Sequence, residues 1–437
     1  MRRMVEQELL RWKESERRKP LIVRGARQVG KTYSIERLGR DSFDGVVRVD
    51  LERNRDWHRV FEGNLAAQSI VSELEVLTNS KIAPGETLLF FDEIQSCPRA
   101  ITALRYFFEE LPELHVVAAG SLLEFGLAEI SFPVGRVQFL EMHPMTFAEY
   151  LWAIGKDKAA EVVLGEPSKT PDAVHTMLLD ELRRYCFVGG MPEAVGTYAE
   201  SQSMQDAFEV HRELCDTFRE DFSKYAARSD PDCLNATLSG VARNVGQQVR
   251  YSRLAEGHAH TTAKRAFNLL CRARVVNKVP SATPSGLPLG AKESAARFKA
   301  IMVDIGLWQH RCGMKVEEEY AKKDLLDVYR GAMAEQFVGQ EMMVSQTSDL
   351  HYWAREAKGS TAEVDYLAVV DGSIYGVEVK SGPAGRLRSL HVMLENYPTC
   401  RGGLVFSTGP YGELPGQKLT FIPLYFAHSA TRQRASV

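Results

Sequence analysis

The sequence has few of the features that mark secreted or membrane proteins. Its seven cysteines are scattered over 437 residues without a C-x-x-C pair, which argues against a disulfide framework or a zinc site and predicts reduced thiols. No apolar run approaches the roughly 18–20 residues that span a bilayer. The N-terminus is charged from Arg2 onward and has no signal-peptide core. We therefore expect a soluble, cytoplasmic protein without a membrane partner.

The chain also lacks a strong excess of either charge. Its net charge is −3, so a surface that binds nucleic acid must be local and cannot involve the whole molecule. Hydrophobic residues make up 44% of the sequence and charged residues 25%, values typical of globular proteins. The length corresponds to about three domains of ordinary size.

The most informative motif that is present lies near the N-terminus. Residues 25–32 read G-x-x-x-x-G-K-T, follow an apolar run and precede a helix-like segment. This order is typical of a P-loop, in which backbone N–H groups and the helix N-terminus bind phosphates. We expect Lys31 to reach the β- and γ-phosphates of ATP and the Thr32 hydroxyl to bind Mg²⁺. The predicted nucleotide contacts are Gly25, Ala26, Arg27, Gln28, Val29, Gly30, Lys31, Thr32 and Tyr33.

A second motif supports the first. Residues 87–93 read TLLFFDE, an apolar strand that ends in two acids. Asp92 suits the metal, and Glu93 suits the base that activates water. Two further residues are candidates near the γ-phosphate. Ser121 follows the fourth predicted strand and equally fits a helix N-cap; Arg136 fits a phosphate-contacting finger, in cis or in trans, and equally fits a surface ion pair.

The order of predicted elements indicates the fold. Nearly continuous apolar strands alternate with helical stretches through the first 150 residues, which predicts a three-layer α/β domain with the nucleotide at the carboxyl ends of parallel strands. Residues 145–225 are mostly helical in pattern and resemble a lid or connector. The strands are predicted at 20–24, 46–50, 87–92, 115–119 and 136–140.

Residues 231–310 show three helical segments followed by two strands, the arrangement of a winged helix. Between Arg243 and Lys278 the chain has eight lysines and arginines and one acid. Such a segment is typical of a surface that contacts a phosphate backbone. An interdomain spacer with a solvated basic face is the alternative. The predicted nucleic-acid contacts are Arg250, Lys264, Arg265 and Arg272.

A hairpin near the C-terminus carries a second group of acids. The dipeptide at 371–372 is Asp-Gly, which favours a two-residue turn between alternating strands. This register places Asp365 opposite Glu378 and Glu363 opposite Lys380, all on one face.

Opposed carboxylates repel, so the hairpin predicts a divalent ion, Mg²⁺ or Mn²⁺, held by Asp365 and Glu378. Such an ion would support phosphodiester cleavage, with Lys380 orienting water and Glu335 approaching from a helix. An exposed sheet face with a Glu363–Lys380 ion pair is the alternative.

Together these segments resemble one family. RGARQVGKT, LLFFDEIQ, AAGSLLEF, FLEMHPMTFAEYL and VGGMPEAV are similar to bacterial and archaeal AAA-type P-loop ATPases. DIGLW, GAMAEQFVGQEM, AEVDYL and YGVEVKSG are similar to their C-terminal part, a winged helix joined to a domain resembling PD-(D/E)XK nucleases and Holliday-junction resolvases. The resemblance implies Lys31 and Thr32 for nucleotide and Mg²⁺, and Asp92 and Glu93 for metal and water. It also implies Glu335, Asp365, Glu378 and Lys380 for the nuclease-like site.

The implied architecture is α/β throughout. A P-loop ATPase domain spans 1–150, a helical lid or connector 151–230, a winged helix 231–312, an α/β restriction-endonuclease-like domain 313–426 and a flexible tail 427–437. Two functions remain open: a Mg²⁺-dependent ATPase that acts on nucleic acid, most simply DNA, or an ATP-dependent switch or scaffold whose nuclease-like domain binds a protein partner without cleavage. The sequence leaves the oligomeric state open.

Overall fold

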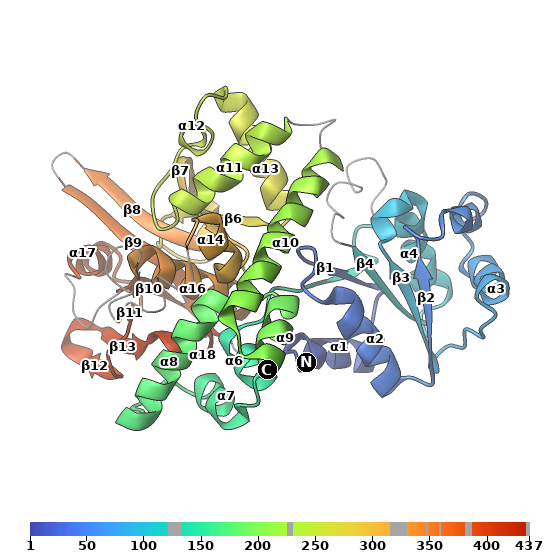
Figure 1. Ribbon diagram of the computed structural model, residues 1–437, viewed down its shortest axis with the longest axis horizontal. Helices are drawn as coiled ribbons and strands as arrows, with labels where there is room; N and C mark the ends of the chain where they lie inside the picture. Colours follow the sequence, from blue (N-terminus) through green and yellow to red (C-terminus); the bar gives the residue numbers. More distant parts are fainter. Residues whose placement is uncertain are drawn as a thin grey trace. The chain divides into compact units, whose positions relative to one another are not determined.

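The computed structural model describes residues 1–120, 133–224, 230–314, 330–346, 348–357, 360–380 and 387–433 (Figure 1). Two compact units divide the chain. The N-terminal unit comprises residues 2–143 together with 272–274, and the C-terminal unit comprises residue 1, residues 144–271 and residues 275–437. Among the described helices, none combines the length and the hydropathy that crossing a membrane requires.

The N-terminal unit is built on a five-stranded parallel sheet with the strand order β2-β3-β4-β1-β5. Its strands are β1 (Leu21–Arg24), β2 (Gly45–Asp50), β3 (Thr87–Asp92), β4 (His115–Gly120) and β5 (Gln138–Glu141). Every residue of β3 and β4 is buried, which explains their nearly continuous apolar sequences. The predicted parallel α/β arrangement is therefore confirmed for this unit.

Helices cover both faces of this sheet. On one face, Leu89 and Phe91 of β3 join a core cluster with residues of α3 (Ala67–Thr78) and α4 (Pro98–Glu110). On the other face, α2 (Lys31–Ser42) packs so closely that a Cβ on Gly39 would lie 2.1 Å from a methyl carbon of Val46. Helix α1 (Val5–Glu14) contacts α2. Because all five strands are parallel, their carboxyl ends share one edge, which is where the P-loop and Asp92 lie.

The C-terminal unit begins with a group of helices (Figure 1). The predicted break in the helical region is present, since α8 ends at Val188 and α9 begins at Pro192. The next three helices, α11, α12 and α13, match the three helical segments predicted within 231–310. The bounds of these helices are α6 (Phe147–Ala153), α7 (Asp157–Leu164), α8 (Asp172–Val188), α9 (Pro192–Ser201), α10 (Met204–Lys224), α11 (Pro231–Arg243), α12 (Tyr251–Leu254) and α13 (His260–Arg272).

An eight-stranded sheet follows, with the order β12-β13-β11-β10-β9-β8-β6-β7. The predicted wing strands β6 and β7 belong to this sheet, and β6 meets β8 at the pair Ser281 and Tyr352. The strands are β6 (Val276–Ala282), β7 (Glu293–Met302), β8 (His351–Ala357), β9 (Ser360–Val370), β10 (Ser373–Val379), β11 (Gly402–Ser407), β12 (Gly412–Leu414) and β13 (Leu419–Pro423). Segments 231–312 and 313–426 therefore share one sheet.

The remaining helices of this unit are α14 (Ile305–Arg311), α16 (Arg330–Ser345), α17 (Arg388–Asn396) and α18 (Ala427–Thr431). The prediction of a flexible tail from residue 427 is wrong for its first part. Residues 427–431 form α18, and His428 and Thr431 are buried there, where the Thr431 hydroxyl lies 2.6 Å from that of Ser345. The sequence of α18, AHSAT, is short and has few apolar residues, so its hydrophobic pattern did not predict a buried helix.

Candidate nucleotide site and C-terminal carboxylate cluster

The loop between β1 and α2 has the backbone of a phosphate-binding turn. Gln28 and Gly30 adopt positive φ angles of 63° and 92°, and α2 starts directly after Gly30. A Cβ on Gly25 would lie 2.1 Å from the carbonyl oxygen of Met142, so only glycine fits at this position. Ala26 and Val29 are buried beneath the loop.

Lys31 lies at the base of this loop with 7% of its surface exposed. Its ammonium donates hydrogen bonds to the carbonyl oxygens of Ala26, at 2.7 Å, and Gly25, at 3.1 Å. Burial lowers the pKa of Lys31 to about 8, because the acids at 92 and 93 offset only part of the cost of desolvation. Neutral carbonyls are weaker partners than phosphate oxygens, so a nucleotide would offer this ammonium a better environment.

Thr32 and Asp92 meet at the edge of the sheet. The Thr32 hydroxyl donates to the two carboxylate oxygens of Asp92, at 3.2 and 3.4 Å. Burial raises the pKa of Asp92, although a nearby guanidinium opposes this effect. A hydroxyl and a carboxylate are hard oxygen ligands that suit an Mg²⁺ ion, which keeps several of its waters. The donor set therefore fits the predicted metal.

That guanidinium belongs to Arg48, which the sequence analysis did not identify as a site residue. Arg48 lies on β2 and its Nη2 is 2.7 Å from Asp92 Oδ2, while Nη1 is 2.9 Å from Glu36. Its side chain is 41% exposed. Only the pairing of β2 with β3 places Arg48 here, and the sequence does not determine strand order.

Glu93 follows Asp92 in a left-handed conformation, with φ at 47°. Its backbone N–H donates to Asp92 Oδ1 at 3.1 Å, and its side chain accepts from the Gln95 amide at 2.6 Å. A hollow of about 310 Å³ opens over this region. Its lining comprises Thr32, Arg48, Asp50, Glu52, Arg53, Asp92 and Glu93.

Other predicted nucleotide contacts have different surroundings. Arg136 pairs with Glu109 of α4, Nε to Oε1 at 2.9 Å, and is 45% exposed, as expected for the surface ion-pair alternative. Gln28 is exposed, and Tyr33 is 47% exposed on the first turn of α2. Ser121 lies outside the described residues, directly after β4.

In the C-terminal unit the predicted hairpin is confirmed as far as its ladder extends. Residues pair from Ser373 with Val370 to Val377 with Tyr366, in the predicted register. Both turn residues have positive φ angles, 48° at Asp371 and 72° at Gly372.

The predicted alternative of a Glu363–Lys380 pair is wrong. Strand β10 ends at Val379, and the backbone N–H of Lys380 donates to Phe406 of β11, away from β9. The Lys380 ammonium instead pairs with Glu378, at 2.6 Å. Glu363 pairs in the sheet with Ala354 of β8.

A second lysine, which the sequence analysis missed, lies among the acids. Lys299 of β7 is 1% exposed, and its ammonium is 2.6 Å from Glu363, 2.7 Å from Glu335 and 3.2 Å from Asp365. Burial opposes the charge on Lys299, but the three acids outweigh it and hold the pKa well above its usual value. Burial also raises the pKa of Glu335, against the pull of Lys299. The one sequence feature that could have indicated this role is that Lys299 directly precedes the apolar residues at the end of its strand.

As they stand, these acids do not fit a divalent ion. Within the described ranges, no group of three or more His, Cys, Asp or Glu side chains is arranged to hold a metal. Asp365 accepts from the Val379 N–H at 2.8 Å with the oxygen that does not face Lys299. Glu378 has one buried oxygen without a hydrogen-bond partner, and burial raises the pKa of this carboxyl. The predicted metal site at Asp365 and Glu378 stays a prediction.

Three of the four predicted nucleic-acid residues lie on helix α13, and the fourth directly precedes α12. Lys264 and Arg265 are exposed on α13, whereas Ala266 and Phe267 are buried, so the basic side chains occupy the outer face. Arg272, the last residue of α13, is also exposed, as is Arg250, directly before α12.

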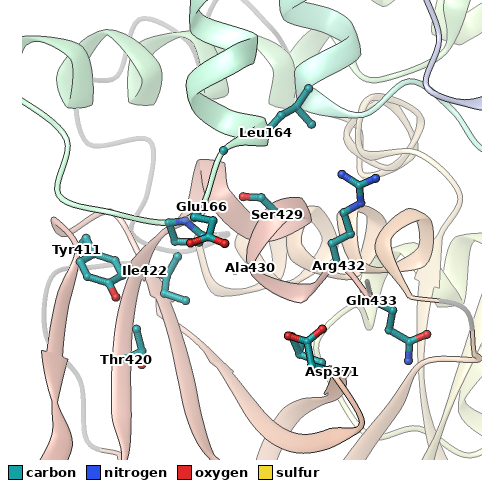
Figure 2. A pocket seen from close by; sticks show the side chains of 13 residues that line it. Leu164, Glu166, Asp371, Tyr411, Thr420, Ile422, Ser429, Ala430, Arg432 and Gln433 are labelled. Carbon is teal, nitrogen blue, oxygen red and sulfur yellow. The ribbon is translucent and has the colours of Figure 1, made fainter. Parts of the chain in front are cut away.

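The C-terminal unit also contains a hollow of about 580 Å³ beside α18. Figure 2 shows Glu166, Arg432 and Asp371 spread around it without converging on one point. Convergent polar groups are what usually fix a ligand's orientation, so this hollow suggests no ligand.

Three family models match parts of the chain. Residues 17–151 match an AAA domain. Residues 179–318 and 330–426 each match a domain of unknown function, DUF8612 and DUF4143. The curated proteins contain no match.

Three of the solved structures that match the chain are all distant from it. "Thermotoga maritima RuvB Holliday junction branch migration motor" is 15% identical over 63% of this chain and 89% of its own, with a TM-score of 0.30. AMPPCP-bound DnaA from Aquifex aeolicus is 13% identical over 60% and 85%, with a TM-score of 0.26. C. elegans PCH-2 is 15% identical over 45% and 60%, with a TM-score of 0.26, so the chain spans less than two thirds of that protein.

The match to the AAA family at residues 17–151 agrees with the phosphate-binding backbone of the loop between β1 and α2. The N-terminal unit therefore contains an AAA-type P-loop domain.

Proposed function

We propose that the chain is a Mg²⁺-dependent ATP hydrolase that acts on nucleic acid. The observation that carries the hydrolase proposal is the hydrogen bond from the Thr32 hydroxyl to Asp92. It lies beside the P-loop, whose carbonyls contact the Lys31 ammonium. These are the three groups that phosphoryl transfer requires at a P-loop: a metal-binding hydroxyl, a metal-binding carboxylate and a cation for the phosphates.

Each residue has a distinct role in this proposal. The loop N–H groups and the Lys31 ammonium bind the phosphates, and Thr32 and Asp92 would hold Mg²⁺. An ion held there would supply positive charge against the charge that develops on the phosphates. Glu93 follows Asp92 and, with it, lines the hollow of about 310 Å³, where its carboxylate can orient the attacking water and accept its proton.

Arg48 is expected to compete with the metal. Its ion pair with Asp92 neutralises the carboxylate that Mg²⁺ needs, so Arg48→Ala should lower the Mg²⁺ concentration required for ATP binding. Because Arg48 is 41% exposed, solvent weakens the pair, and we expect a shift of about threefold to tenfold. The measurement is a Mg²⁺ titration of binding of a fluorescent ATP analogue.

Arg53→Ala is the matched control, since Arg53 lines the same hollow and is exposed. If the Mg²⁺ concentration at half-maximal ATP binding were the same in Arg48→Ala as in the wild type, Arg48 would not compete with the metal for Asp92.

The nucleic-acid part of the proposal rests on the outer face of α13. Neutralising Arg250, Lys264, Arg265 and Arg272 together should weaken DNA binding. The slope of log affinity against log salt should also fall, by about 0.9 for each phosphate contact that is lost. Fluorescence anisotropy at several salt concentrations measures both quantities.

The control also loses four positive charges, at exposed residues away from α13: Lys158, Lys169, Arg388 and Arg401. An unchanged salt slope in the α13 variant would remove this surface from the proposal and leave the spacer alternative.

The form of nucleic acid is tested by the ATPase itself. Hydrolysis is measured without DNA and with single-stranded, duplex or branched DNA. Stimulation by one form supports action on nucleic acid and identifies the form. No stimulation by any form favours the second candidate function, an ATP-dependent switch or scaffold. Mn²⁺-dependent cleavage of any form would favour the nuclease hypothesis for Asp365 and Glu378.

A further inference from the structure

The C-terminal carboxylate cluster, formed by Glu335, Glu363, Asp365 and Glu378, contains a cation of its own. Lys299 is 1% exposed, and three of the four acids lie within 3.2 Å of its ammonium. A lysine at this depth is retained only when opposite charges pair with it. Here the acids come from two different elements, Glu335 from α16 and the other two from β9.

The ammonium and a divalent ion would need the same oxygens. Lys299 contacts Oε1 of Glu335, Oε1 of Glu363 and Oδ1 of Asp365. Mg²⁺ and Mn²⁺ bind carboxylate oxygens at about 2.0–2.2 Å, so an ion on these oxygens would overlap the ammonium. The second oxygen of Asp365 is engaged by the Val379 N–H at 2.8 Å, and the first oxygen of Glu378 by Lys380 at 2.6 Å.

The segment before α12 closes the cluster from one side. The Gln248 amide donates to the second oxygen of Glu363. At Gly246 an added Cβ would lie 2.9 Å from the second oxygen of Glu335. The second oxygen of Glu378 is buried without a hydrogen-bond partner, whereas one oxygen of each of the other three acids already contacts the Lys299 ammonium.

The cluster also joins two parts of the eight-stranded sheet. Strand β7 lies at its edge and carries Lys299, whereas β9 lies three places along the order and carries Glu363 and Asp365. Between them, β6 and β8 share the register pair Ser281 and Tyr352. The ion pairs of Lys299 therefore connect β7 with β9 across the part of the sheet where β6 and β8 share this short pairing.

We propose that Lys299 is the resident counter-ion of this cluster, that it stands where a divalent metal would bind, and that the cluster works as a metal-free clamp between β7, β9 and α16. This inference concerns the C-terminal unit alone and does not depend on ATP hydrolysis.

The test counts Mn²⁺ ions bound by the intact chain without nucleotide, from the EPR signal of free Mn²⁺. Wild type and Asp365→Asn should bind the same number of ions. Lys299→Met should bind one more ion than the wild type, because the acids lose their counter-ion, and this ion should be lost again in Lys299→Met/Asp365→Asn. Lys380→Met is the matched control and should gain no ion, since Lys299 remains in place.

Two results would overturn the proposal. One is a wild-type chain that loses a bound Mn²⁺ ion on Asp365→Asn, because the metal would then bind despite Lys299. The other is a folded Lys299→Met chain that gains no ion. Thermal melting monitors the fold, and Mn²⁺ should raise the Tm of Lys299→Met by more than it raises that of the wild type. Should Lys299→Met fail to fold, the comparison of wild type with Asp365→Asn decides alone.

Discussion

Replacing Lys31 with alanine is expected to abolish ATP binding. Lys31 is the buried cation at the base of the P-loop, where its ammonium already contacts two loop carbonyls. Charge-assisted bonds to phosphate are stronger than these, and the low local dielectric increases their strength. We expect a loss of at least about 100-fold in affinity, roughly 3 kcal/mol, in titrations with a fluorescent ATP analogue.

Arg40→Ala is the matched control, because Arg40 is an exposed cation on the same helix, α2. It removes the same charge and should leave the affinity within about twofold of the wild type, as surface charges contribute little. Equal losses in the two variants would mean that net charge alone attracts the nucleotide. Unchanged affinity in Lys31→Ala would contradict the assignment of the loop.

The depressed pKa of Lys31 adds a pH dependence to the same titration. Phosphate binding requires the charged ammonium, and the pKa of Lys31 without nucleotide is about 8. Affinity for ATP should therefore be constant well below pH 8 and should fall as the pH rises through 8 to 9, because the proton must then be taken up on binding. A lysine with an ordinary pKa of about 10.4 would show no such loss in this range.

Replacing Glu93 with glutamine should stop hydrolysis while leaving ATP bound. The amide keeps the size of the side chain but cannot accept a proton from water. General-base catalysis contributes about 10²–10⁴-fold, so the rate of phosphate release should fall by at least about 100-fold. ATP affinity should stay within about twofold, since Glu93 is not among the residues expected to hold phosphate or metal.

Glu52→Gln is the control for this variant, because Glu52 lines the same hollow and is exposed. It should hydrolyse ATP at nearly the wild-type rate. A Glu93→Gln chain that releases phosphate as fast as the wild type would show that another group activates the water.

Motifs that are local in sequence were predicted correctly. The glycine loop with its flanking strand and helix, and the Asp-Gly hairpin with its register, depend on neighbouring residues alone. The acidic end of β3 reaches the loop because parallel strands align their carboxyl ends.

Contacts made by residues distant in sequence were missed. Arg48 reaches Asp92 through the pairing of β2 with β3, and Lys299 reaches Glu335 and Asp365 through the assembly of the eight-stranded sheet. Neither strand order follows from hydrophobic pattern. The Glu363–Lys380 pair was expected because the hairpin ladder was extended beyond Val377, the last residue of β10 that pairs with β9.

Asp92 and the C-terminal carboxylate cluster are each paired with a basic side chain of the same chain, and the two basic residues differ in exposure. Arg48 is 41% exposed, so solvent weakens its ion pair with Asp92. Lys299 is 1% exposed and is held by three acids. The first arrangement permits a metal-dependent reaction in the N-terminal unit, and the second disfavours one in the C-terminal unit.

Phosphate release from ATP by the wild-type chain tests the central claim most directly. The rate is measured at saturating ATP with Mg²⁺ and, in parallel, with EDTA in its place. Hydrolysis that requires Mg²⁺ is predicted, because Thr32 and Asp92 are the only metal-binding groups assigned to the P-loop and phosphoryl transfer needs the ion between them. A rate with EDTA equal to the rate with Mg²⁺, or no phosphate release in either condition, with and without nucleic acid, would contradict the account.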